Sequence, residues 1–217
     1  MTLLFVYDSV YTNNKDGVNV MDTYENVSFV MEQQRGYLSS KDARSFGIDN
    51  KTLQRMASSG KIERIAHGLY INSEVFPDPF FVAQYRCPKG VFSHETALFL
   101  HDLSDRNPLR LMMTIPSGWN SKLISDKNMM FFYSEPERMN LGACKIETPS
   151  GVTVAVYNIE RTLCDCLRSV EKLDRDLILT ALKRYIKTNT RDNAKLMEYA
   201  TVLKIRDIVY RYLEVLS

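Results

Sequence analysis

The chain lacks the features that mark several large protein classes. Nine glycines and seven prolines among 217 residues are too few for a fibrous or linker-like chain, and the 45% hydrophobic and 25% charged residues exclude wholesale disorder. No apolar run reaches the roughly 18 residues that a membrane-spanning helix needs. The apolar start Leu3–Tyr7 follows no Lys or Arg and is shorter than the core of a signal peptide. We therefore expect a globular, cytoplasmic protein without a membrane partner.

Cysteine and histidine are also scarce, which argues against disulfides and metal sites. The sequence has four cysteines and three histidines. Cys164 and Cys166 point to different faces of a predicted helix, and no Cys-x-x-Cys pair is present, so we expect reduced and mostly buried thiols. His94 and His101 share a helix face and are formally possible zinc ligands. Because no third ligand lies nearby, we favour hydrogen-bonded structural histidines and expect neither a metal nor a cofactor.

Common catalytic motifs are missing. The sequence contains no Gly-x-x-x-x-Gly-Lys-Ser/Thr, no Gly-x-Gly-x-x-Gly and no Gly-x-Ser-x-Gly. His94-Glu95 begins like a zinc-protease helix, but Leu98 stands where the second histidine is required. No Glu-x-Lys occurs either, which weakens the commonest restriction-nuclease pattern. We expect a protein that is not an enzyme.

Charge is unevenly distributed along the chain, although the formal net charge is only +2. Residues 1–34 carry one Lys against five acids, and residues 35–71 carry seven Lys and Arg against three acids. Residues 72–160 are slightly acidic, whereas residues 161–217 carry twelve basic against eight acidic residues. Two basic regions therefore flank an acidic middle. This pattern hints at a polyanionic partner, although a basic surface commonly serves solubility alone.

The order of predicted elements in the first third is that of a winged helix-turn-helix domain. A first helix follows Asp22 or Thr23 and stops at Arg35-Gly36. Capping residues and terminal glycines then predict two short helices, and a glycine-tipped hairpin follows them. These predicted segments are the helices 41–46 and 51–58 and the hairpin strands 62–65 and 69–71.

The second short helix has the two faces that reading a DNA major groove requires. Leu53, Met56 and Ala57 share one side, and the opposite side is polar. Arginine pairs well with guanine and glutamine with adenine, and the hairpin would touch the backbone or the minor groove. An ordinary solvated helical hairpin remains the alternative. The predicted DNA-binding residues are Lys51, Thr52, Gln54, Arg55, Lys61, Arg64 and His67.

The remaining two thirds predict a mixed α+β domain with a helical C-terminal tail. Strands at 109–115, 129–133, 144–147 and 152–157 alternate with turns rich in proline and glycine, and helices follow from residue 158 onward. The expected organisation is an uncertain leader over 1–21, a DNA-binding domain over 22–73 and an α+β domain over 74–217.

Two groups of basic residues in the second domain are candidates for contact with a partner. Arg161 and Asp165 have the spacing of an ion pair on a helix surface, so Arg161 has either a structural role or a place on a surface for a partner protein or nucleic acid. Lys183, Arg184 and Lys187 fall close together on one helix, where they would meet phosphates or simply face water.

Residues 35–70 resemble the N-terminal winged helix-turn-helix of AbiEi-type antitoxins, a family of bacterial type IV toxin–antitoxin and abortive-infection systems. The most specific match is the run Gly60-Lys61-Ile62-Glu63-Arg64 followed by Gly68-Leu69-Tyr70. Two further matches, Ser93–Leu103 and Glu160–Asp165, extend the resemblance over residues from about 22 to 187.

The resemblance implies a phage-defence antitoxin with two roles. Its N-terminal domain would bind inverted repeats of double-stranded DNA in its own promoter and repress the operon. Its C-terminal domain would counteract a co-encoded nucleotidyltransferase toxin, with no need for a stable complex. The alternative is a protein-interaction module that binds and neutralises a toxin directly without binding DNA.

Overall fold

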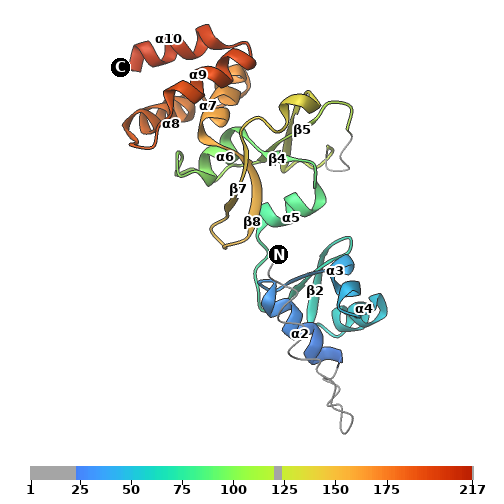
Figure 1. Ribbon diagram of the computed structural model, residues 1–217. Coiled ribbons are helices and arrows are strands. Elements are labelled where there is room, and N and C mark those ends of the chain that lie inside the picture. Colours follow the sequence, from blue (N-terminus) through green and yellow to red (C-terminus); the bar gives the residue numbers. More distant parts are fainter. Residues whose placement is uncertain (1–22, 120–123, 217) are drawn as a thin grey trace. The chain divides into compact units, whose positions relative to one another are not determined.

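The computed structural model describes residues 23–119 and 124–216 and divides the chain into two compact units, Met1–Phe76 and Pro77–Ser217 (Figure 1). The predicted leader 1–21 lies outside the described residues. Both units combine helices with a β-sheet, which confirms the α+β class. Within the described ranges, no helix is both long and apolar enough to cross a membrane.

The two short helices of the N-terminal unit begin after side chains that cap them. The Ser39 hydroxyl accepts a hydrogen bond from the backbone N–H of Asp42 at 3.0 Å, and Asp49 caps the next helix in the same way. Gly47, with a φ of +72°, lies in the left-handed region and stops the first of these two short helices. Within residues 23–76, the helices are α2 (Thr23–Gln33), α3 (Ser40–Ser45) and α4 (Asn50–Ser58).

A three-stranded antiparallel sheet completes this unit, with the strand order β1-β3-β2. Strands β2 (Ile62–Ala66) and β3 (Leu69–Asn72) form the predicted hairpin. Strand β1 (Tyr37–Ser39) is not predicted by the sequence, because three residues that are all buried show no alternation between polar and apolar faces.

The apolar sides of these elements meet in one core, which sets the rotation of α4. Leu53 and Met56 of α4 pack with Val27, Met31 and Leu38, and all five are almost completely buried. Because residues three and four apart lie on one side of a helix, burial of this side turns the opposite side of α4 outward.

The C-terminal unit is built on a five-stranded mixed sheet with the strand order β6-β5-β4-β8-β7. The pairs β5–β6 and β4–β8 are parallel, and the pairs β4–β5 and β7–β8 are antiparallel. The two-residue strand β4 is too short to be predicted from a pattern. The strands are β4 (Val91–Phe92), β5 (Leu111–Pro116), β6 (Met129–Ser134), β7 (Ala143–Glu147) and β8 (Thr153–Tyr157).

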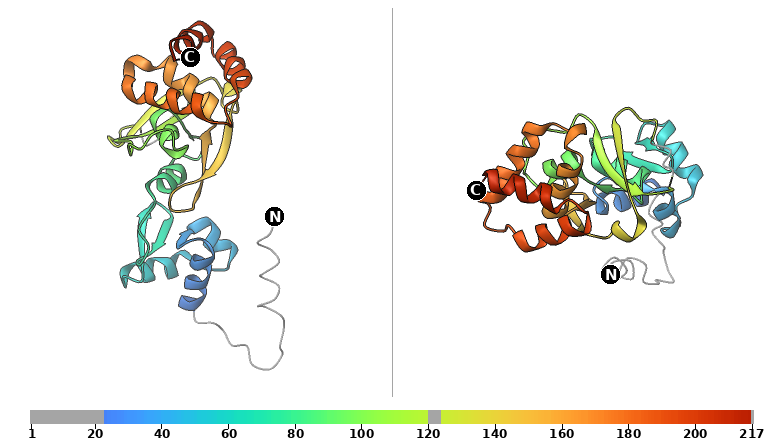
Figure 2. Two further views of the ribbon diagram at one scale, coloured as in Figure 1. Left: turned by 90° about the vertical axis from the view of Figure 1, so that its left-hand side faces the viewer. Right: turned by 90° about the horizontal axis from the view of Figure 1, so that it is seen from above.

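Helices α7 to α10 form the predicted C-terminal helical tail and gather on one side of this sheet (Figures 1 and 2). They share one apolar cluster with α6, whereas α5 packs into a second cluster with the sheet. The helices are α5 (Pro79–Arg86), α6 (His94–Leu100), α7 (Ile159–Arg168), α8 (Arg175–Lys187), α9 (Asn193–Val202) and α10 (Arg206–Leu216), with 3-10 turns η1 (Pro136–Arg138) and η2 (Val170–Lys172).

All four cysteines are free thiols, and Cys144 is the most accessible of them. Burial raises the pKa of the Cys144, Cys164 and Cys166 thiols. Because the thiolate is the reactive form, we expect a thiol reagent to modify about one cysteine per native chain, slowly, and all four after unfolding in urea. Absorbance with Ellman's reagent measures this. Rapid reaction of two or more thiols in the native protein would contradict the burial of Cys164 and Cys166.

Candidate nucleic-acid interface

Helix α4 begins at a cap that involves several of the predicted DNA-binding residues. The Asp49 carboxylate accepts a hydrogen bond from the backbone N–H of Thr52 at 2.7 Å. This bond, a second bond to the Thr52 hydroxyl and the positive charges of Arg55 and Lys51 lower the pKa of Asp49. The carboxylate therefore stays ionised and holds the first turn of α4 in place beside two cations.

The outward side of α4 carries the polar residues that the sequence predicts there. Lys51, Gln54, Arg55 and Ser58 are exposed, and together with the flanking Asp49 and Ser59 they line one shallow hollow of the surface. Neither Gln54 nor Arg55 is packed inside the unit. Side chains with bidentate hydrogen-bonding ends are thus presented side by side to solvent.

Thr52 does not belong to this outward side, which corrects its prediction as a DNA contact. Only 5% of the residue is exposed, because it lies one position before Leu53 on the buried half of the helix. Its Oγ1 accepts a hydrogen bond from Nη2 of Arg55 at 3.3 Å. Thr52 therefore positions the Arg55 guanidinium.

The tip of the β2–β3 hairpin carries two further predicted contacts in one arrangement. Arg64 and His67 are exposed, and Nη2 of Arg64 lies 3.1 Å from Nδ1 of His67. Gly68 at the tip has a φ of +72°, which the tight turn requires and which a residue with a Cβ adopts only with strain. The turn therefore places the Arg64 guanidinium beside the His67 imidazole at the end of the hairpin.

Lys61 is exposed but lies away from the hollow on α4. Its amine sits 4.1 Å above the ring of Tyr24 on α2, and it lines a different hollow that includes Glu25 and Glu32. The structure therefore groups Lys61 with α2 and does not bring it together with Lys51, Gln54 and Arg55.

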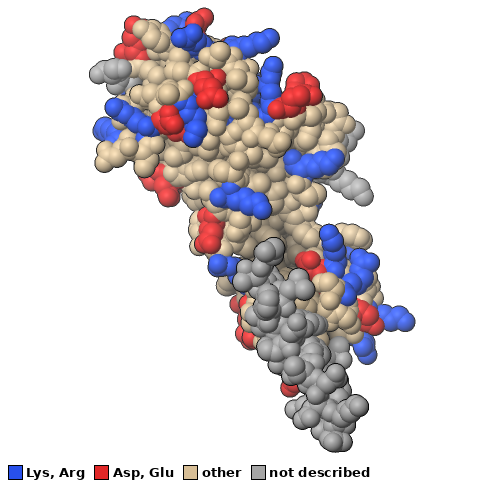
Figure 3. Space-filling view, viewed as in Figure 1, with Lys and Arg blue, Asp and Glu red and all other residues tan. Residues whose placement is uncertain are grey.

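Two basic residues of α3 were not among the predicted contacts. Lys41 and Arg44 are exposed, and Arg44 is held by a hydrogen bond from its Nε to the backbone oxygen of Ser40 at 3.1 Å. Figure 3 shows Lys and Arg side chains gathered over the part of the N-terminal unit that holds α3 and α4. The local net charge of +4 over residues 35–71 already contained this signal.

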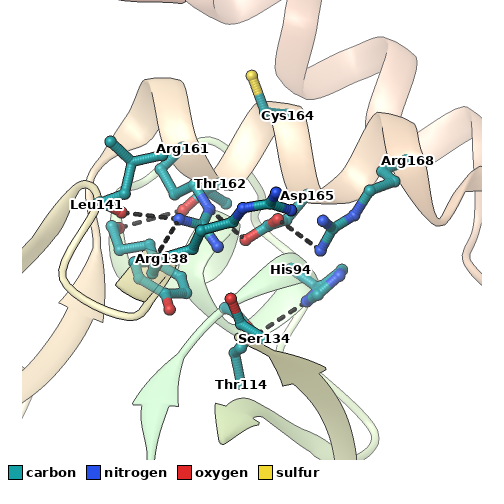
Figure 4. Close-up of polar contacts among 12 residues, drawn as sticks. His94, Thr114, Ser134, Arg138, Leu141, Arg161, Thr162, Cys164, Asp165 and Arg168 are labelled. Atoms are coloured by element: carbon teal, nitrogen blue, oxygen red, sulfur yellow. Dashed lines mark hydrogen bonds and ion pairs between the residues drawn. The ribbon is translucent and has the colours of Figure 1, made fainter. Parts of the chain in front are cut away.

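In the C-terminal unit, Arg161 has the structural role that was one of its two predicted roles, and it does not lie on a surface for a partner. Arg161 is 0% exposed, and its guanidinium lies between the loop of Arg138 and Leu141 and the carboxylate of Asp165 (Figure 4). Nη1 donates to the backbone oxygens of Arg138 and Leu141 at 3.0 and 2.9 Å. The guanidinium also stacks over the ring of Tyr157. Gly142 allows this close approach, because a Cβ there would lie 2.7 Å from the Cβ of Arg161.

The predicted pair of Arg161 and Asp165 exists, but inside the unit and not on its surface. Nε of Arg161 lies 2.9 Å from Oδ2 of Asp165, and Nη2 of the partly exposed Arg168 lies 3.2 Å from Oδ1. Burial raises the pKa of Asp165, and the two arginines counteract this effect. The ion pairs with the two arginines compensate the Asp165 carboxylate for the water contacts that it loses on burial. The cluster therefore has a structural role.

The three basic residues of α8 that were predicted to form one surface group differ in their surroundings. Lys183 and Lys187 are exposed, whereas Arg184 is bound by both of its terminal nitrogens to the carboxylate of Asp105. Arg184 also donates to the backbone oxygen of Asp102 at 3.3 Å. Its guanidinium anchors the loop after α6, which leaves two lysines as the solvent-facing cations of this group.

His94 and His101 have separate hydrogen-bond partners. His94 is buried, with Nδ1 2.9 Å from the Ser93 hydroxyl and Nε2 3.3 Å from that of Ser169, and its ring stacks on Phe132. Ser93 is the residue immediately before α6, and its hydroxyl makes no capping bond. Nε2 of His101 lies 2.7 Å from the Tyr157 backbone oxygen. Among the residues that the structure describes, no group of three potential metal ligands occurs.

Burial lowers the pKa of His94 well below its usual 6.5, and the positive charges of Arg168 and Arg161 add to this effect. Below pH 6.5 the unfolded chain therefore binds more protons than the folded one. The free energy of unfolding consequently falls as the pH is lowered. We expect His94 to contribute a loss of about 1.4 kcal/mol in the free energy of unfolding per pH unit between pH 6 and pH 5. Urea unfolding at several pH values, followed by fluorescence of the single tryptophan, Trp119, measures the slope.

His94→Asn is the matched variant for this prediction, because His94 has a φ of +52° and asparagine tolerates that backbone conformation. The variant is expected to show a shallower slope over the same pH range. The slope that remains is expected from His101, whose pKa burial also lowers against the opposing effect of its bond to the Tyr157 backbone. An unchanged slope would show that His94 is already accessible to protons in the folded state.

Comparison with known proteins adds a family and a fold. Within the N-terminal unit, residues 28–73 match the model of the family described as transcriptional regulator, AbiEi antitoxin. No protein with a curated description matches the chain. The crystal structure of the RV2827C protein from Mycobacterium tuberculosis is similar in fold, with a TM-score of 0.50, at 10% sequence identity over 89% of this chain and 80% of that chain. The resemblance to AbiEi-type antitoxins is thus confirmed for residues 28–73, the segment from α2 to the end of β3 that carries the polar side of α4.

Proposed function

We propose that the protein is a DNA-binding transcriptional regulator of the AbiEi antitoxin kind that binds inverted repeats in its own promoter and represses its operon. In this proposal residues 22–73 are a winged helix-turn-helix domain, with α4 as the recognition helix and the β2–β3 hairpin as the wing. The observation that carries the proposal is the exposed polar side of α4 within the segment that matches the family. Binding to chromosomal DNA also implies a cytoplasmic location.

The side chains on α4 suit the readout of base edges. Arg55 is able to donate two hydrogen bonds to guanine, and Gln54 is able to pair with adenine. Since α4 has nine residues, its first turns fit into a major groove with Lys51 close to a phosphate. Arg64 and His67 on the wing would then contact the backbone or the adjacent minor groove.

The basic residues around α4 would supply affinity that does not depend on sequence. Lys41 and Arg44 on α3 add to Lys51 and Arg64, and each phosphate that a cation neutralises releases condensed counterions. We therefore expect the affinity to fall steeply with salt concentration. The hydrogen bond to Thr52 restricts the orientation of the Arg55 guanidinium before DNA is bound. Less conformational entropy is therefore lost when Arg55 binds a base.

The experiment is a gel shift with the full chain and DNA from upstream of its own reading frame. We expect a retarded complex that a scrambled fragment of equal length does not compete away. The logarithm of its apparent binding constant is expected to fall linearly with the logarithm of salt concentration. Equal binding to both fragments at physiological salt would remove the regulator role. Absence of any complex would favour the alternative, a protein-interaction module that neutralises a toxin directly.

For residues 74–217 we propose the antitoxin role against a co-encoded nucleotidyltransferase toxin. The family matched at residues 28–73 is described as an antitoxin, and the nucleotidyltransferase is what the resemblance of the sequence to AbiEi-type antitoxins implies. The test is rescue of bacterial growth when toxin and protein are expressed from separate promoters. Rescue by the chain with Arg55→Ala would separate this role from DNA binding. Failure of both chains to rescue growth would contradict it.

A further inference from the structure

Helices α8 and α10 leave a groove between them on the C-terminal unit. Both pack on α7, but they make few contacts with each other. The end of α7 and the turn η2 form the floor of this groove, which encloses about 580 Å³. A gap between two helices that lie on a third has the form that receives a further helix.

The lining of the groove is mostly apolar and is incompletely covered. Ile208, Tyr212 and Val215 line one wall, and their spacing of four and three residues places them along one side of α10. Leu179 of α8 lines the opposite side, and Val170 of η2 adds an apolar side chain to the floor. Val215 is 84% exposed, so apolar surface of α10 is left open to solvent.

The rim of the groove carries more positive than negative charge. Arg168, Lys172 and Arg211 line it, against the single carboxylate of Glu171. Arg168 offers one nitrogen to Asp165, and Nε of Arg211 donates to the backbone oxygen of Asp207. Within residues 23–119 and 124–216, Lys172 and Arg211 have no carboxylate partner. Their charges remain available to an acidic ligand.

We propose that this groove binds an amphipathic helix of a partner protein whose apolar stripe is flanked by Asp and Glu. The apolar residues of such a helix would cover Tyr212 and Val215, and its carboxylates would meet Lys172 and Arg211. A second copy of the chain fits less well, because a symmetric contact would bring the positive rims together. Nucleic acid fits less well too, because the surface between the rim cations is mostly apolar and a phosphate backbone would not cover it. The inference does not depend on DNA binding by α4.

The experiment selects helical peptides of 16 random residues, displayed on phage, against the full chain and measures the binding of enriched peptides by fluorescence anisotropy. We expect enriched sequences to share apolar residues at spacings of three and four, with acidic neighbours. The double variant Lys172→Glu with Arg211→Glu is expected to weaken binding by about tenfold or more. Val215→Glu is expected to do the same by placing a charge in the apolar wall.

Two exposed positions outside the groove lining provide matched controls. Arg206→Glu changes a charge on the same helix α10, and Val202→Glu puts a glutamate on α9, and both are expected to change binding less than about twofold. The proposal is overturned if no peptide is enriched, if enriched peptides lack acidic flanks, or if Val215→Glu binds them as the unaltered chain does. Sedimentation that shows a dimer which Val215→Glu converts to a monomer would identify the groove as a self-interface and also overturn it.

Discussion

Replacement of Arg161 by alanine is expected to lower the free energy of unfolding of the C-terminal unit by about 3–5 kcal/mol. The guanidinium is fully buried and makes the 2.9 Å ion pair with Asp165, which is also buried. Without Arg161 the carboxylate keeps only the bond to Arg168, and two backbone oxygens of the loop at Arg138 and Leu141 lose their donor. Urea unfolding followed by Trp119 fluorescence measures the loss.

Two companion variants test this explanation. Arg168→Ala removes the partly exposed partner of the same carboxylate, and its cost is expected to stay below about 1 kcal/mol. The double variant Arg161→Met with Asp165→Leu removes both charges, and it is expected to recover most of the stability that Arg161→Ala loses. A loss below 1 kcal/mol in Arg161→Ala, or no recovery in the double variant, would show that the buried pair is not the cause.

Arg55→Ala is expected to weaken binding to the operator by about 1–3 kcal/mol, which is roughly 5- to 150-fold, and to relax the base preference at one position. The reason is the exposed guanidinium on the outward side of α4, held by Thr52 at 3.3 Å. Fluorescence anisotropy with the promoter fragment and with single-base variants of it measures both effects. Equal, unaltered binding by Arg55→Ala would remove this residue from the reading surface.

Lys61→Ala is the matched control for Arg55→Ala, because it removes the same charge from the same unit. Its amine lies over Tyr24 and away from the α4 hollow. We expect it to weaken binding to operator and to unrelated DNA by the same small factor. A selective effect on the operator would place Lys61 at a base and would require an interface that includes α2.

The local elements of the N-terminal unit were predictable because their signals lie within a few residues of each other. Ser39 and Asp49 cap the helices that follow them, and Gly47 ends the first one. Strand β1 was not predictable, because Tyr37–Ser39 becomes a strand only by pairing with residues of β3 that lie 30 to 34 positions further along the chain. The burial of Thr52 likewise follows from the packing of α4 as a whole.

The candidate interface was predictable from the sequence in part, where it depends on the spacing of residues along one helix. The spacing of Leu53 and Met56 sufficed to place Gln54 and Arg55 on the outside of α4. Spacing did not reveal that Lys61 lies with α2, since that depends on where Tyr24 stands in the folded unit. It also could not reveal how α8 and α10 stand apart on α7, which makes the groove.

The capped helices of the N-terminal unit, the glycine-tipped hairpin and the sidedness of α4 follow from the amino-acid sequence alone, because they depend on interactions between neighbours in the chain. Which polar residues are buried follows instead from the packing of distant segments against one another. Arg161 and Asp165 read as a surface pair, since their spacing is the same in a solvated helix. They are buried because the loop at Arg138 and Leu141 and the ring of Tyr157 close over them, and these contacts join segments that are distant in sequence.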